Sequence, residues 1–104
     1  MSAQHVNDQT FQTEVLESSK PVLVDFWAPW CGPCRMMSTV VDELAEDVGG
    51  DAVVVKANVD EAPEIAAKYG IQSIPTFAVI KDGEVQSQLG GIQSKEALHQ
   101  ALVA

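Results

Sequence analysis

Two cysteines occur in this sequence, and they lie three positions apart in Trp30-Cys31-Gly32-Pro33-Cys34. Cysteines at this spacing can form and break a disulfide with each other. The thiolate is the nucleophile in that exchange, and the N–H groups and positive dipole end of a helix favour thiolate over thiol. The apolar spacing that follows predicts a helix beginning at this point. The sequence therefore predicts a reversible thiol–disulfide site.

The position of each sulfur relative to this helix predicts its role. Cys31 lies just outside the helix, so we expect an exposed thiolate that attacks a substrate disulfide. Cys34 lies one turn inside, should be more buried, and is expected to resolve the mixed disulfide by attacking Cys31. Gly32 lets the backbone come close to a partner, and Pro33 stiffens the loop between the cysteines.

Two other uses of a cysteine pair are possible. A structural zinc site needs about four ligands; the cysteines supply two, and His5 and His99 lie near opposite ends of the chain. A structural disulfide closing so short a loop would contribute roughly 2 kcal/mol through loop entropy. Cytosolic disulfides are usually transient and catalytic. Redox chemistry is favoured over both alternatives, and we expect neither a metal nor a cofactor.

A carboxyl group interrupts the most apolar stretch of the sequence. Asp25 lies within residues 22–28, six positions before Cys31. Burial disfavours the charged form, so its pKa should lie above the usual value. Such a group could accept the proton of Cys34, although an Asp with ordinary hydrogen bonds at a strand end is an alternative. Lys56, near the end of a second apolar run, could reach toward Asp25 or point into solvent.

The elements that position these residues follow from the spacing of apolar side chains. Residues 22–28 and 52–57 predict buried strands, and the helix between them makes a parallel βαβ unit. Asp82-Gly83 joins two further strand-like runs and predicts an antiparallel hairpin. Further helices are expected after the caps Asn7 and Asp8, from Pro63, and after Ser94. The prediction is an α/β fold with a central mixed sheet of four to five strands and helices on both faces.

Length, charge and apolar content limit the possible functions. At 104 residues with 46% hydrophobic side chains, the chain is expected to form one domain, residues 1–104. The net charge of −9 argues against binding a nucleic-acid backbone or an anionic membrane. No apolar run reaches the about 20 residues of a membrane span. Residues 1–9 lack the apolar stretch of a secretory signal, so we expect a cytoplasmic protein.

The sequence resembles the thioredoxin family over essentially its full length. Residues 24–34, which run from Val24 to Cys34, resemble the family's active-site signature. Residues 56–60 resemble the strand end that follows it, and residues 69–77 resemble the family's cis-proline segment.

This resemblance implies the thioredoxin fold and the reduction of protein disulfides, with a thioredoxin reductase as electron donor and disulfide-containing proteins as targets. It also implies a monomer in which Cys31 and Cys34 are the redox pair. Asp25 would assist proton transfer with Lys56 beside it, and Pro75 would be cis and lie against the disulfide. The residues implied to receive an extended substrate segment are Trp30, Gly32, Pro33, Ile74, Pro75 and Gly91.

Three alternatives remain beside this interpretation. A protein that oxidises or isomerises disulfides is disfavoured by Gly32-Pro33 and by the missing signal. A glutaredoxin is disfavoured because its motif is flanked by Tyr and lacks the strand that carries Asp25. A binding subunit that uses the groove without redox turnover stays open. The family usually has a proline where Thr39 stands, which predicts a straighter helix at this position.

Overall fold

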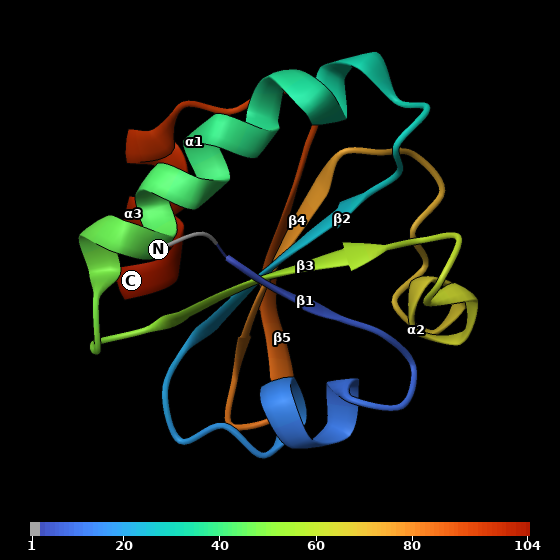
Figure 1. The fold of residues 1–104 in the computed structure, drawn as a ribbon. Helices are drawn as coiled ribbons and strands as arrows, with labels where there is room; N and C mark the ends of the chain where they lie inside the picture. Colours follow the sequence, from blue (N-terminus) through green and yellow to red (C-terminus); the bar gives the residue numbers. More distant parts are fainter. Residues whose placement is uncertain (1–2) are drawn as a thin grey trace.

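The computed structural model describes residues 3–104 and shows a twisted five-stranded sheet with helices on both faces (Figure 1). The elements are β1 (Gln4–Val6), the π-helical segment η1 (Gln12–Leu16), β2 (Val22–Trp27), α1 (Gly32–Val48), β3 (Val53–Asn58), α2 (Pro63–Lys68), β4 (Thr76–Lys81), β5 (Glu84–Gly90) and α3 (Lys95–Val103). The strand order is β1-β3-β2-β4-β5. The first three strands run parallel, and β4 and β5 are antiparallel to their neighbours. The predicted α/β class and mixed sheet are confirmed.

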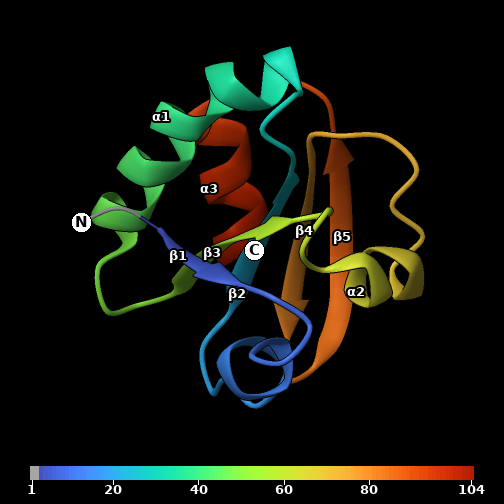
Figure 2. The same cartoon turned by 45° about the vertical axis from the view of Figure 1, so that its right-hand side comes forward.

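The sheet separates two apolar cores. In both views α1 and α3 lie together on one face of the sheet, and α2 and η1 lie on the other (Figures 1 and 2). Successive strand side chains point to opposite faces, so Leu23 packs in the core beneath α1 and α3, whereas Val22 and Val24 pack beneath η1 and α2. Asp25 follows Leu23 by two positions. Its side chain therefore points toward α1, the helix that carries Cys34.

The helix α1 begins and ends where the sequence predicts. Cys31 is its N-cap residue, and Pro33 lies in the first turn, where a missing N–H costs little. Gly49 follows the last turn with φ of 53°, a conformation that favours glycine. The figures show α1 as one continuous helix that curves over the sheet, and the straighter path expected at Thr39 stays a prediction. Helices that wrap around a core curve without any proline.

The first helix is confirmed in part. A helical segment, η1, is found there, and the Phe11 N–H bonds to the Asn7 carbonyl in the turn before it, but Asp8 does not cap it. Its carboxylate instead accepts hydrogen bonds from the N–H groups of Glu64 and Ile65, at 3.3 and 3.1 Å, and so caps α2. Asn7 caps a local turn by accepting from Gln9 and Thr10. A capping residue can serve a helix that is distant in sequence, and local spacing does not reveal that.

The remaining chain matches the prediction closely. Asp82 and Gly83 have φ of 52° and 78°, the positive values that a tight hairpin turn requires. Ser94 caps α3 by accepting from the Ala97 N–H at 3.0 Å. The strand β1 is an addition, since three residues with mostly exposed side chains gave no apolar pattern to detect. Within residues 3–104, no helix is long and apolar enough to cross a membrane.

Candidate redox site

The two cysteines form a disulfide at the point where the chain leaves β2 and enters α1. Their Cα atoms are 5.2 Å apart. The backbone N–H of Cys34 points at the Sγ atom of Cys31 at 3.2 Å, so a helix N-terminal donor does reach the outer sulfur. Cys34 is 2% exposed, as expected for the inner residue. Cys31 is only 6% exposed, and the prediction of an exposed residue is wrong for this disulfide form.

The segment around Pro75 forms a wall beside the disulfide. The Ile74–Pro75 peptide bond is cis. The carbonyl oxygen of Ile74 lies 3.8 Å from Cys31 Sγ, and the Ile74 side chain packs against the cysteine pair. Gly91, with φ of 79°, donates its N–H to the Pro75 carbonyl at 2.8 Å. These contacts bring three of the residues implied to bind substrate to one side of Cys31.

Trp30 is the most prominent apolar side chain beside the disulfide. It is 67% exposed, and its indole Nε1 donates a hydrogen bond to Asp60 Oδ2 at 3.0 Å. Asp60 lies in the loop after β3, so a distant loop fixes the orientation of this ring. Two other large apolar side chains near the site are also exposed: Met36, two residues after Cys34, and Ile92, directly after Gly91.

The local structure explains Pro33 but does not require a glycine at position 32. A Cβ atom at Gly32 would meet only the Nη2 atom of Arg35 at 3.9 Å, which is ordinary contact. The fold itself therefore does not require glycine at this position. Arg35 is held by a hydrogen bond from its Nη1 atom to the Pro29 carbonyl at 3.0 Å. Pro33 lies in the first turn of α1, where its missing N–H costs little.

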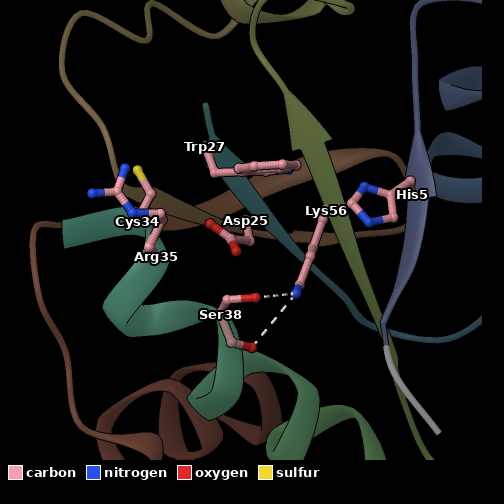
Figure 3. Close-up of a pocket in the computed structure, with 7 residues that line it drawn as sticks. All are labelled: His5, Asp25, Trp27, Cys34, Arg35, Ser38 and Lys56. Carbon is pink, nitrogen blue, oxygen red and sulfur yellow. Dashed lines mark hydrogen bonds between the residues drawn. The ribbon is translucent and has the colours of Figure 1, made fainter. Parts of the chain in front are cut away.

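Asp25 lies in a cavity of about 350 Å³ behind the disulfide. Figure 3 shows it between the Trp27 ring and α1, in the cavity that Cys34 also lines. Asp25 is 2% exposed, and its Oδ1 atom has no hydrogen-bond partner among the described residues. Burial raises its pKa to about 7, with the Lys56 charge opposing and the Asp42 charge adding to the rise. This carboxyl can change its protonation state at neutral pH.

Lys56 is buried, so the alternative of a solvated lysine is wrong, but its direct partner is not Asp25. The Nζ atom lies 3.0 Å from Asp42 Oδ1 and 2.8 Å from Ser38 Oγ, both on α1. Lys56 is the strand neighbour of Asp25 in the β2–β3 register. Its longer side chain extends past Asp25 to the helix. It acts on Asp25 through its charge, by lowering the pKa of that carboxyl.

The comparisons with known proteins agree with this geometry. Residues 2–104 match the family model described as thioredoxin. A protein named thioredoxin 1 from Synechococcus elongatus is 55% identical over 97 residues, which cover 93% of this chain and 91% of the relative. Thioredoxin 1 of Nostoc sp. is 52% identical over 101 residues, covering 97% and 94%. The thioredoxin of Pyropia yezoensis is 52% identical over 102 residues, covering 98% and 95%.

This chain belongs to the thioredoxin family. Its activity is accordingly that of a thiol–disulfide oxidoreductase that reduces protein disulfides. Thioredoxins as a family take their electrons from a thioredoxin reductase and pass them to disulfide-containing proteins. The cysteine pair at the start of α1 is placed as this chemistry requires.

Sequence reasoning missed Ser38 and His5, which line the cavity, and Asp42, which pairs with Lys56 beside it. Ser38 and Asp42 follow Cys34 at intervals of four, so all three lie on one face of α1. That spacing was a usable signal. His5 also lines the cavity from β1. It gave no signal because β1 itself was not predicted.

Proposed function

We propose that Cys31 is the attacking thiol of this disulfide reductase and that Cys34 is the resolving thiol. The Cys31 thiolate attacks a substrate disulfide, forms a mixed disulfide and releases one substrate thiolate. Cys34 then attacks Cys31 Sγ, the second substrate thiolate leaves, and the Cys31–Cys34 disulfide forms. Two electrons pass from the protein to the substrate. The observation that carries this assignment is the Cys34 N–H directed at Cys31 Sγ at 3.2 Å, because this donor favours a thiolate at Cys31.

Asp25 is the proton acceptor for Cys34 in this proposal. It shares a cavity with Cys34, has an unpartnered oxygen, and has a pKa of about 7 because of its burial. A base is most effective when its pKa lies near the working pH. Lys56 assists by favouring the ionised form of Asp25 through its charge.

The substrate segment lies along Trp30, Ile74, Pro75 and Gly91 in this proposal. Strand-like pairing with the backbone of Ile74 would hold an extended peptide. Gly32 and Pro33 form the adjoining surface beside the disulfide. The proposed setting is a monomer in the cytoplasm, reduced by a thioredoxin reductase and acting on target proteins.

The test is insulin-disulfide reduction with NADPH and a thioredoxin reductase. We expect Cys31→Ser to abolish the reaction, because the attacking sulfur is lost. Cys34→Ser should also stop turnover, but it should accumulate a mixed disulfide through Cys31 that a non-reducing gel and mass spectrometry detect. The exposed variant His99→Gln serves as the control and should retain full activity.

The roles would be reversed if Cys31→Ser, and not Cys34→Ser, trapped substrate. The variant with both cysteines replaced by serine addresses the non-redox alternative. If this variant kept full function in the cell, binding through the groove would be the main role, and the redox proposal would fail.

A further inference from the structure

His5 lines the same cavity as Asp25 and Cys34, although nothing in the mechanism above uses it. Figure 3 shows Cys34 at one side of this cavity and His5 at the other, with Asp25 and Lys56 between them. His5 is exposed, whereas Asp25 is almost fully buried. The cavity therefore connects a buried carboxyl beside the disulfide with an imidazole in contact with solvent.

The His5 ring is held in place by its surroundings. It meets the ring of Trp27 edge-on, with ring centres 5.7 Å apart. Its strand is paired with β3 so that His5 lies opposite Lys56. The N–H of Ala3, the residue before this strand, donates to Asp42 Oδ1 on α1 at 3.1 Å. This side chain belongs to a defined cavity wall and not to a loose terminus.

The charged groups around His5 differ in whether they can accept a proton. Lys56 faces it from β3, Asp25 lies on β2, and Arg35 and Asp42 lie on α1. Lysine and arginine, when charged, carry only donors and cannot accept a proton. Asp42 is already engaged by Lys56 and by Ala3. The charge interaction with His5 is one of the causes that lower the pKa of Asp42. An imidazole both accepts and donates a proton in the neutral range.

The cavity is large and polar enough to carry a proton between the two groups. Its volume of about 350 Å³ is more than ten times the roughly 30 Å³ that one water occupies in the liquid. Asp25 Oδ1 and Trp27 Nε1 are buried and have no hydrogen-bond partner among the described residues. Buried polar groups of this kind are the ones that internal water satisfies.

We infer that His5 exchanges the proton of Asp25 with solvent through water in this cavity, an inference that rests on the proposed role of Asp25. When Cys34 resolves the mixed disulfide, its thiol proton moves to the Asp25 carboxylate. The new disulfide forms, and the substrate leaves as a thiolate. The proton on Asp25 then passes through water to the neutral His5 imidazole, which releases it to solvent. No electrons move in this second step, and Asp25 returns to its ionised form. His5 does not touch the sulfurs and acts only through Asp25.

The test compares His5→Gln with the matched variant His99→Gln. Glutamine keeps hydrogen-bonding capacity but does not titrate, and His99 is exposed on α3 outside this cavity. Stopped-flow fluorescence follows disulfide formation after the dithiol form is mixed with a small disulfide of acidic thiols, and a pH-indicator dye follows the proton release after it, from pH 6 to 8 at low buffer concentration. Full general acid–base catalysis contributes roughly 10²–10⁴-fold, and because solvent can still enter the cavity we expect His5→Gln to slow the proton release by about threefold to tenfold. Added imidazole should restore the rate, and His99→Gln should react like the original protein.

Two results would overturn the role of His5. One is an unchanged rate and pH profile in His5→Gln; the other is a slower rate that imidazole does not restore, which would indicate packing against Trp27 alone. The variants Asp25→Asn and Asp25→Asn/His5→Gln separate this inference from the proposal beneath it. If Asp25→Asn is slow and the double variant is no slower, the two residues act in series as inferred. If Asp25→Asn is slow while His5→Gln is not, only the inference fails. If Asp25→Asn reacts at the original rate, the proposed proton acceptor itself is wrong.

Discussion

Asp25 and Asp42 lie near the same lysine, one on the buried strand β2 and the other on the partly exposed helix α1. Asp42 pairs with Lys56 at 3.0 Å and accepts the Ala3 N–H at 3.1 Å. Although its partial burial opposes ionisation, the hydrogen bond from Ala3 and the pairing with Lys56 hold its pKa below the usual value. Asp25 has an oxygen without a partner, and burial raises its pKa to about 7.

This contrast shows how one lysine can serve two carboxyl groups differently. Direct pairing fixes Asp42 as an anion at neutral pH, which suits a structural group. The same positive charge acts on Asp25 without a direct contact. It lowers the pKa of Asp25 by less than burial raises it. A carboxyl that must take up and release a proton needs a pKa near the working pH. For Asp25, the opposing effects of burial and of the Lys56 charge give such a pKa. The position of Lys56, turned toward α1, is therefore as important to Asp25 as its presence.

The largest expected effect comes from replacing the unpaired carboxyl. The pKa of Asp25 rises from 3.8 to about 7 on folding, and each unit corresponds to about 1.4 kcal/mol. A carboxyl whose pKa is raised in the folded state destabilises the fold increasingly as pH rises from about 4 to 7, and fully above 7. We expect Asp25→Asn to raise the free energy of unfolding of the disulfide form by roughly 4 kcal/mol at pH 8. Near pH 4 the gain should disappear. Urea denaturation at both pH values measures this difference.

Asp82→Asn is the matched control for that experiment. Asp82 is exposed in the hairpin turn, and asparagine also tolerates its φ of 52°. The control should show little change at either pH. A stability gain in Asp25→Asn that was equal at pH 4 and pH 8 would contradict the raised pKa and point to packing instead.

A smaller effect is expected from replacing the paired carboxyl. Asp42→Asn removes the direct partner of a buried lysine, which should cost about 2 kcal/mol at pH 6, where Asp25 is mostly protonated. The loss should shrink at pH 8, because ionised Asp25 then offers Lys56 a second anion. The pKa of Asp25 should fall, since the Asp42 charge raises it. Urea denaturation and carbon-detected NMR titration of the Asp25 carboxyl measure the two effects.

Glu43→Gln tests whether any lost charge on α1 has the same result. Glu43 forms a more exposed ion pair with Lys95 of α3, at 3.5 Å, and does not contact Lys56 in any ion pair among the described residues. This control should leave the Asp25 titration unchanged. An Asp42→Asn protein with an unaltered Asp25 pKa would mean that the Asp42 charge does not act on Asp25.

The residues proposed to carry chemistry were predictable because each breaks a local pattern. Asp25 interrupts an apolar strand, and the cysteine pair lies where that strand meets a helix. The mixed sheet followed from apolar spacing and the Asp82-Gly83 turn. The cis form of Pro75 came from the family resemblance and not from the residues, because most peptide bonds before proline are trans.

The parts that were missed depend on contacts between distant segments. The partner of Lys56 could not be deduced from strand pairing alone, since its direction is decided by Ser38 and Asp42 on α1. The strand β1 is short and carries little apolar pattern. The position of His5 at the cavity could therefore not be deduced from the sequence. Asp8 caps a helix more than fifty residues away. Such contacts are set by tertiary packing, which local periodicity does not encode.

The smallest effect is expected from the hydroxyl group that shares Lys56 with Asp42. Ser38→Ala removes the 2.8 Å hydrogen bond to Lys56 Nζ, which should cost about 1 kcal/mol. The Asp42 ion pair and the Ser38 carbonyl, at 3.5 Å, remain to hold the ammonium group. The Asp25 titration should therefore move less than in Asp42→Asn, and Thr39→Ala, exposed one position along the same helix, should leave both quantities unchanged. If Ser38→Ala moved the Asp25 pKa as far as Asp42→Asn does, the hydroxyl and not the carboxylate would be the group that keeps Lys56 away from Asp25.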